Sequence, residues 1–142
     1  MQRILKGYLT PEKGLANALP ATGMAGVQRS AQYLAYKQYT GAPVWQIGDA
    51  KVWVKVQQSL ALGDMEQVSG HNFDTVIQAL IKIARRLGIR HVFFHISPDT
   101  PLHRLWKTRY KGMPSFPVLF QDFGAGIPLE KIKFTFADID IF

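Results

Sequence analysis

The sequence predicts a mixed α/β (α+β) domain, with a mostly antiparallel central sheet of about six to seven strands and helices on both faces. Three observations support this class. Apolar residues recur at three-and-four spacing through residues 73–87, which predicts a long amphipathic helix. A strand at 60–65 before it and the apolar run His91–Ile96 after it complete a βαβ unit. Upstream, two β-rich runs flank a Gly-Asp dipeptide and predict a hairpin.

The first forty residues predict one strand followed by helices. Gln2–Leu9 is a candidate first strand, with Ile4, Leu5, Tyr8 and Leu9 as its apolar content. Thr10-Pro-Glu-Lys has the order typical of a helix start, since threonine is a good cap and proline suits the first helical position. A further helix is predicted from about Gly26 to Tyr39.

The middle of the chain predicts three antiparallel strands. Val44–Ile47 and Lys51–Gln57 are joined by Gly48-Asp49, a tight-turn signal, and Ser59–Met65 continues the meander. Along the second strand Val52, Val54 and Val56 share one face, because side chains alternate between the two sides of a sheet.

Residues after the meander predict two helices and two closing strands. Asn72 is a candidate N-cap of the helix at 73–87, and Gly88 is expected to end that helix. Asp99–Tyr110 is the second predicted helix. Val118–Phe123 and Lys131–Ile141 are predicted as the last two strands, joined by a loop rich in glycine and proline.

The composition indicates one domain, residues 1–142, with enough apolar content for a core. The chain has no cysteine, which excludes disulfides and a thiolate nucleophile. It opens with no signal peptide and has no run of about 20 apolar residues, so no membrane span and a cytoplasmic setting are expected. The net charge of +7 comes from scattered lysines and arginines, which argues against nucleic-acid binding and leaves a phosphate-rich ligand or a solvated surface.

A loop before the long helix reads Gln67-Val-Ser-Gly70-His-Asn72. With the order of elements, it resembles the GNAT acetyltransferase superfamily, in which a Gln/Arg-x-x-Gly-x-Gly/Ala loop holds the pyrophosphate of acetyl-CoA. A helix N-terminus suits that anion, because its N–H groups are unpaired and its dipole is positive. Asn72 stands where the family has a small residue, and Asp74 adds a negative charge nearby. The resemblance implies an acetyl-CoA site at Met65, Gln67, Val68, Ser69, Gly70, His71 and Asn72.

A second signature of the family, Asn-x-x-Ala-x-x-Leu-Tyr, corresponds in spacing to Asp99-Thr-Pro-Leu102-His-Arg-Leu105-Trp106. Asp99 is the candidate cap of this helix. Trp106 replaces the tyrosine that protonates the leaving thiolate in relatives, and an indole N–H is not a useful acid near neutral pH. Tyr110, one helical turn further, is therefore the candidate general acid.

Acetyl transfer also needs a base and a donor to the thioester carbonyl. Glu66, with Asp64 beside it, is the candidate base, and the N–H of Met65 or Gln67 is the candidate donor to the carbonyl.

The resemblance implies an acyl-CoA-dependent N-acyltransferase that acts on an amine of a small molecule or peptide. The acceptor is expected near Trp53, Gln57 and the N-terminal helices. Dimers are common in the family, so it also points to a homodimer. The altered positions Asn72 and Trp106 support an alternative, a catalytically inactive domain of this fold that binds or interacts. A small basic nucleic-acid-binding domain is a third hypothesis, which predicts strongly salt-dependent binding.

No metal site is predicted. His91 and His95 share a strand face but stand roughly 13 Å apart along it, too far to ligate one zinc ion. Asp138 and Asp140 alternate on the last predicted strand, a pattern typical of an exposed strand edge.

Overall fold

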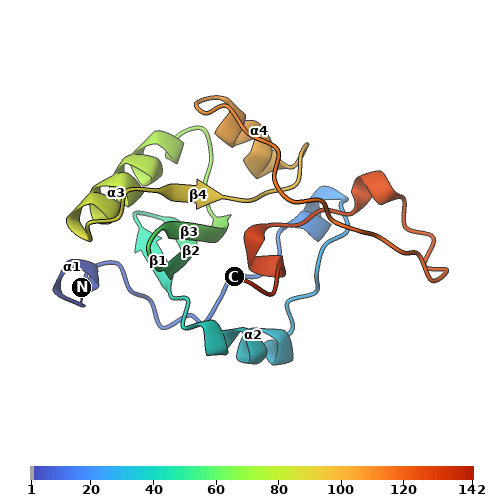
Figure 1. Ribbon diagram of the computed structural model, residues 1–142, viewed down its shortest axis with the longest axis horizontal. Coiled ribbons are helices and arrows are strands. Elements are labelled where there is room, and N and C mark those ends of the chain that lie inside the picture. The colour runs from blue at the N-terminus through green and yellow to red at the C-terminus, as the bar shows by residue number, and fades with distance from the viewer. Residues whose placement is uncertain (1) are drawn as a thin grey trace.

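A computed structural model describes residues 2–142. Its centre is a sheet in the order β1-β2-β3-β4, formed by Val44–Ile47, Ala50–Val56, Leu60–Glu66 and Val92–Phe94 (Figure 1). The first three strands are antiparallel, and β4 runs parallel to β3. The mixed α/β class is confirmed, whereas the described part of the chain forms four strands instead of the expected six to seven.

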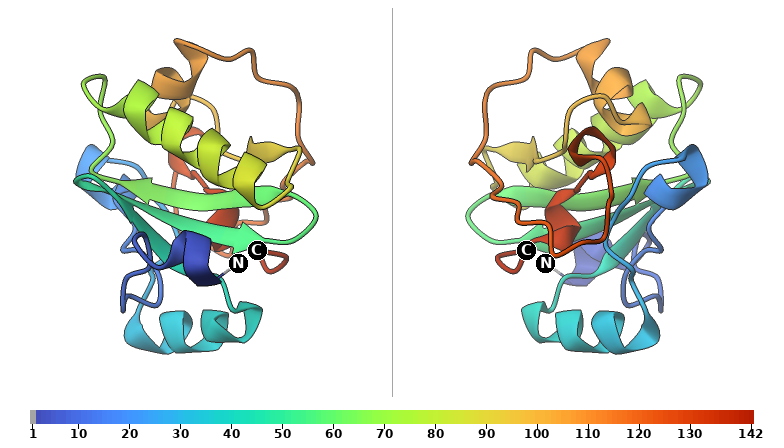
Figure 2. Two further views of the ribbon diagram at one scale, coloured as in Figure 1. Left: turned by 90° about the vertical axis from the view of Figure 1, so that its left-hand side faces the viewer. Right: turned by 90° about the vertical axis from the view of Figure 1, so that its right-hand side faces the viewer.

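Helices cover both faces of this sheet. Figure 2 shows α3 and α4 above the sheet and α2 below it. The α-helices are α1 (Gln2–Leu5), α2 (Ala31–Lys37), α3 (Phe73–Arg86) and α4 (Pro101–Lys107). Short 3-10 helices are η1 (Leu19–Thr22), η2 (Gln38–Thr40), η3 (Leu129–Lys131) and η4 (Phe136–Asp138). No helix in residues 2–142 is long and apolar enough to cross a membrane.

Two apolar clusters hold the layers together, one on each side of the sheet. Val52 and Val54 of β2 face α3, whereas Trp53 between them faces the opposite side, as the predicted alternation requires. The α3 side is the larger cluster, and α3 buries a continuous stripe there: Phe73, Val76, Ile77, Leu80, Ile83 and Ala84. On the other side Trp53 packs with Leu15, Val44, Ala61, Phe136, Ala137 and Phe142.

The prediction of a long helix is confirmed, since α3 covers 14 residues of the expected segment. Its apolar spacing places one stripe against the sheet and leaves the charged residues outside. Gly88 follows the last turn with φ +72°, a left-handed conformation that glycine adopts without steric cost.

The predicted first strand at Gln2–Leu9 is wrong, because a short helix buries Leu5 there and only Leu9 forms a bridge, to Trp45. The helix predicted from Thr10 is also wrong. The Thr10 N–H and hydroxyl both donate to the Val44 carbonyl, at 3.1 and 3.2 Å, which ties this segment to the sheet in an extended form.

The helix predicted over residues 26–39 begins later, at Ala31. Its cap is Ser30, whose Oγ accepts the Tyr33 N–H at 3.2 Å. Residues before Ser30 remain outside the helix, and Arg29 among them reaches into the interior of the protein.

The two predicted closing strands, Val118–Phe123 and Lys131–Ile141, are wrong. The first lies in a segment without regular structure, residues 112–128, which we call the arm and which projects from the body in Figure 1. The second folds into 3-10 turns, and its backbone pairs with other segments in isolated bridges at Ala25–Ile132 and Ile96–Thr135. A capping box between Thr135 and Asp138 turns the chain there and prevents an extended strand.

Elements at the centre of the fold are shorter than predicted. Strand β4 covers three residues, and α4 begins at Pro101. Asp99 is not the cap of α4. Thr100 is, since its hydroxyl accepts the His103 N–H at 3.1 Å.

Candidate functional site

The two parallel strands β3 and β4 separate soon after they pair. Their pairing covers only Leu60–Leu62 and Val92–Phe94, after which β3 continues beside β2 to Glu66. The chain beyond β4 turns away toward α4. A cavity of about 600 Å³ fills the resulting space, and we call it the wedge cavity. Its walls are Ala16–Leu19, Thr22, Asp64–Gly70, Ile96, Thr100–Leu102, Leu105 and Thr135.

Most residues of the predicted cofactor loop lie on the wall of the wedge cavity. Met65, Gln67, Val68, Ser69 and Gly70 line it, together with the candidate base Glu66. His71 and Asn72 do not line it, and His71 is exposed. The structure therefore brings the strand end and the first part of the loop to one cavity, while the last two loop residues do not take part in its wall.

The Asn72 side chain makes two hydrogen bonds across this loop. Its side-chain oxygen accepts the Ser69 N–H at 2.9 Å, and its side-chain nitrogen donates to the Gln67 carbonyl at 2.8 Å. Asn72 stands at the N-cap position of α3, as predicted, but its side chain makes no hydrogen bond to the first turn of the helix. These two bonds hold Gln67 at φ +57°, a left-handed conformation uncommon for a residue other than glycine.

Backbone donors of the loop are left available to a ligand. The N–H groups of Val68 and Gly70 meet no acceptor within residues 2–142, and both residues line the wedge cavity. No atom lies within 4 Å of the position that a Cβ on Gly70 would take, so the space beside this residue is open. Two free amides next to the N-terminus of α3 form an arrangement that suits an anion.

Asp74, in the first turn of α3, would oppose such an anion by itself. Arg109 offsets its charge through a two-pronged ion pair, with Nε 3.0 Å from Oδ1 and Nη2 3.0 Å from Oδ2. Asp74 and Arg109 are both more than half exposed, so the pair adds little stability. Its effect on the site is to remove a net negative charge from the N-terminus of α3.

A buried ion cluster joins Asp64, on the wall of the wedge cavity, to Arg29 and Asp138, which do not line the cavity. Arg29 Nη1 lies 2.6 Å from Asp64 Oδ2, and Arg29 Nη2 lies 2.9 Å from Asp138 Oδ1. The Arg29 and Asp138 side chains are completely buried, and that of Asp64 is 7% exposed. Asp138 is therefore not at an exposed strand edge, contrary to the sequence prediction. Arg29 has no local signal in the sequence, since its partners lie 35 and 109 positions away.

Both carboxylate oxygens of Asp64 already have partners within the protein. Oδ2 pairs with Arg29 and Oδ1 accepts the Met65 N–H at 2.8 Å. Burial raises the pKa of Asp64, and the charge of Arg29 opposes this shift. The Met65 N–H is likewise taken and does not point to a ligand. Glu66 remains as the carboxylate of the wall without an ion-pair partner among the described residues.

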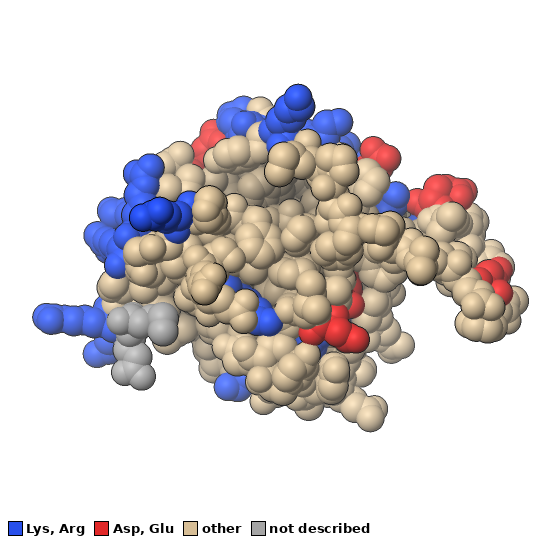
Figure 3. All heavy atoms as spheres, in the orientation of Figure 1, with Lys and Arg blue, Asp and Glu red and all other residues tan. Residues whose placement is uncertain are grey.

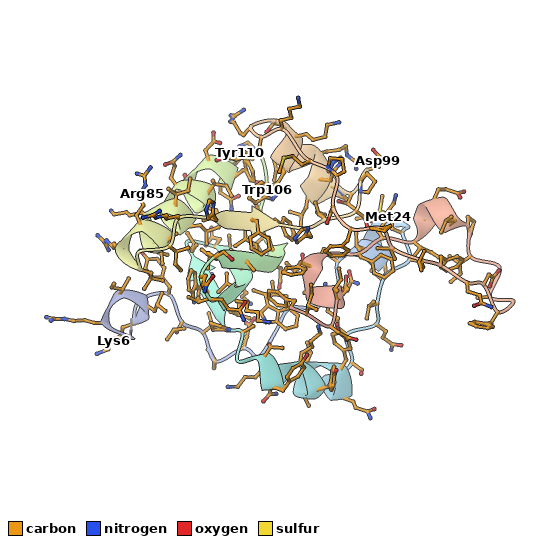
Figure 4. All side chains as sticks on the ribbon, viewed as in Figure 1. Lys6, Met24, Arg85, Asp99, Trp106 and Tyr110 are labelled. Carbon is orange, nitrogen blue, oxygen red and sulfur yellow. The ribbon has the colours of Figure 1, made fainter. Side chains whose placement is uncertain are left out.

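The candidate acid Tyr110 lies elsewhere. Its side chain is 44% exposed and lines a second cavity, between α4 and the arm, so the structure does not bring Tyr110 and Glu66 to one cavity. Trp106 packs edge-on against Phe73, with ring centroids 5.4 Å apart, and its buried indole N–H has no acceptor in residues 2–142. Figure 4 shows Trp106 directed inward and Tyr110 at the outer end of α4.

The expected acceptor position near Trp53 and Gln57 is wrong for Trp53. Its ring is 1% exposed, packs edge-on against Phe142, and donates its indole N–H to the Ala42 carbonyl at 3.1 Å. Trp53 is a core residue and offers no surface to an acceptor. Within the described residues no three histidine or acidic side chains gather as metal ligands.

Comparisons with protein-family models, with curated proteins and with solved structures find no significant match to this chain.

Proposed function

We propose that this protein is an acyl-CoA-dependent N-acyltransferase whose cofactor site is the wedge cavity. The observation that carries the proposal is the separation of β3 from β4, which opens the cavity at the end of β3 and beside the N-terminus of α3. A volume of about 600 Å³ is within the range of small-molecule sites.

The chemistry of the walls supports a ligand with a phosphate at one end and an uncharged chain at the other. Free N–H groups at Val68 and Gly70 suit pyrophosphate oxygens. Apolar side chains on the opposite wall, Leu102 and Leu105 of α4, suit a pantetheine arm that runs along the cavity. Glu66 lies at the end of β3 and is the wall's candidate to accept a proton from an attacking amine.

A second candidate function is a domain that binds the same cofactor without catalysis. Two observations favour this second function. The buried indole N–H of Trp106 has no hydrogen-bond acceptor in residues 2–142, and Tyr110 does not line the wedge cavity. Both observations leave the departing thiolate without a side-chain acid in the wedge. The two functions differ in turnover and share the cofactor site.

We expect acetyl-CoA and CoA to bind at micromolar concentration in a calorimetric titration, and Gly70→Trp to abolish this binding. The reason is that a ring at Gly70 fills space that is empty in the free protein, so the fold tolerates the substitution while the ligand is excluded. Gly7→Trp is the matched control, because Gly7 is also exposed with no atom near its Cβ position and does not line the wedge cavity. Equal binding by the wild type and Gly70→Trp, or no binding at millimolar cofactor, would overturn the proposal.

A further inference from the structure

The second cavity has a volume of about 1010 Å³ and lies between α4, the end of β4, the arm and the C-terminal turns. We call it the arm cavity. Ile96 and Thr135, which bridge each other, line both this cavity and the wedge cavity. The two cavities therefore meet at this bridge. A group held in the arm cavity near Ile96 lies next to the inner end of the proposed cofactor site.

The charged side chains on the wall of the arm cavity are all basic. The charged or titratable side chains on its wall are His95, His103, Lys107, Arg109, Tyr110 and Lys111, and no carboxylate is among the lining residues. Arg109 is already paired with Asp74, whereas Lys107 and Lys111 make no ion pair within residues 2–142. Figure 3 shows the lysines and arginines gathered along the upper edge of the molecule, over α3 and α4. These two lysines suit a ligand carboxylate.

Much of the remaining wall of the arm cavity is apolar and aromatic. It includes Met113, Phe116, Val118, Phe120, Leu129 and Phe134. Phe116, Val118, Phe120 and Leu129 are more than 40% exposed, so this wall has little protein packed against it. Such a surface suits a large apolar group on the ligand.

His95 stands where the aromatic wall meets Ile96. Its Nδ1 lies 2.6 Å from Ser115 Oγ, and its ring packs against Phe136 and Phe116 with centroids 4.8 and 5.1 Å apart. When Nδ1–H donates to Ser115, Nε2 carries the free lone pair. Burial lowers the pKa of His95 below its ordinary 6.5, so the ring is neutral at pH 7 and able to accept a proton.

We infer that the arm cavity is the acceptor site, that its acceptor is an α-amino acid with a large apolar side chain, and that His95, instead of Glu66 on the wedge wall, is the base. The inference rests on the proposed function. The three groups of such an amino acid match three parts of the cavity wall. Its carboxylate faces Lys107 and Lys111, its side chain faces the apolar wall around Phe116, and its amine faces His95.

The reaction balances without a further reactant. His95 Nε2 takes one proton from the ammonium group and releases it to solvent. The amine lone pair then forms the C–N bond to the thioester carbon, and the C–S electron pair leaves with sulfur. The second proton on nitrogen passes to the thiolate, which gives the N-acyl amino acid and free CoA thiol.

Three measurements on the whole chain test this inference, with phenylalanine, phenylalanine amide and acetyl-CoA as probes. We expect phenylalanine to bind in a calorimetric titration, the amide to bind at least about tenfold more weakly, and Lys107→Gln with Lys111→Gln to remove this difference while acetyl-CoA affinity stays unchanged. Lys82→Gln, at an exposed lysine of α3, is the control.

In the transfer assay, release of CoA thiol is expected to fall about 100-fold in His95→Gln and to stay unchanged in His91→Gln, at an exposed histidine that lines neither cavity. The wild-type rate is expected to decline as the pH falls through the pKa of His95, below 6.5, and His95→Gln to lose this decline. Acetyl-CoA binding without phenylalanine binding overturns the acceptor site and leaves the proposed function. Phenylalanine binding without acetyl-CoA binding overturns the transferase. An unchanged rate or pH profile in His95→Gln overturns the role of His95.

Discussion

Replacing Arg29 with methionine is expected to lower the free energy of unfolding by about 3–5 kcal/mol, because it leaves Asp64 and Asp138 buried without a counter-charge. Methionine keeps the apolar stem, so most of the loss is electrostatic. Urea denaturation followed by circular dichroism measures the change. Lys51→Met is the matched control, since it breaks a partly exposed pair with Glu12 that solvent screens and that is expected to contribute far less to stability.

The pH dependence of this variant provides a second readout. The pKa of Asp64 is raised in the folded protein, so ionisation of its carboxyl group opposes folding. The protonated carboxyl group contributes fully to stability below pH 3.8, its ordinary pKa, and this contribution is lost as the pH rises through the raised pKa. Without Arg29 that pKa rises further, because the attraction that opposes desolvation is gone. The destabilisation of Arg29→Met is therefore expected to be larger at about pH 7 than at about pH 4. An equal loss at both values would show that the cluster is not electrostatic.

Truncation of Phe142 to alanine is expected to destabilise the protein by about 3–5 kcal/mol. Its ring is fully buried and packs edge-on against Trp53 and Phe136, with centroids 5.5 and 5.4 Å apart. Phe123→Ala removes the same group from an 88% exposed position on the arm and is expected to change stability by no more than about 0.5 kcal/mol.

Gly63 tests the same contact from the other side. It is the residue of β3 left unpaired where the β2–β3 register shifts, and a Cβ there would overlap the Phe142 ring. Gly63→Ala is expected to cost about 1–3 kcal/mol in the wild type and less in the Phe142→Ala background, where the ring is absent. Additive effects in the double variant would contradict this packing.

Elements of the fold that follow from local patterns were predictable from the sequence. The three-and-four spacing from Phe73 predicts α3, and Gly48-Asp49 between β-rich runs predicts the β1–β2 hairpin. The alternation along β2 also predicts that Val52 and Trp53 face opposite clusters. In each case the signal and the structure span the same few residues.

Elements that depend on distant partners were not predictable. Val118–Phe123 has the composition of a strand, yet no strand pairs with it within the described chain. Asp138 has the alternation of an edge residue, but a guanidinium 109 positions away draws it inside. Local propensity does not encode such contacts, so both predictions were wrong.

The candidate site also has a part that was predictable from the sequence and a part that was not. The strand end and loop from Met65 to Gly70 were predictable, because a βαβ unit places the loop at the N-terminus of a helix. The Asn72 side chain that closes the loop and the arm cavity around His95 were not, since both depend on how segments meet in space.

Amide chemical shifts of the 15N-labelled protein during titration with CoA test the proposed cofactor site in the wedge cavity most directly. The free N–H groups of Val68 and Gly70 are expected to show the largest changes, because they are proposed to donate to the pyrophosphate. Changes concentrated in the arm at residues 112–128, or none at saturating CoA, would contradict a cofactor site in the wedge cavity.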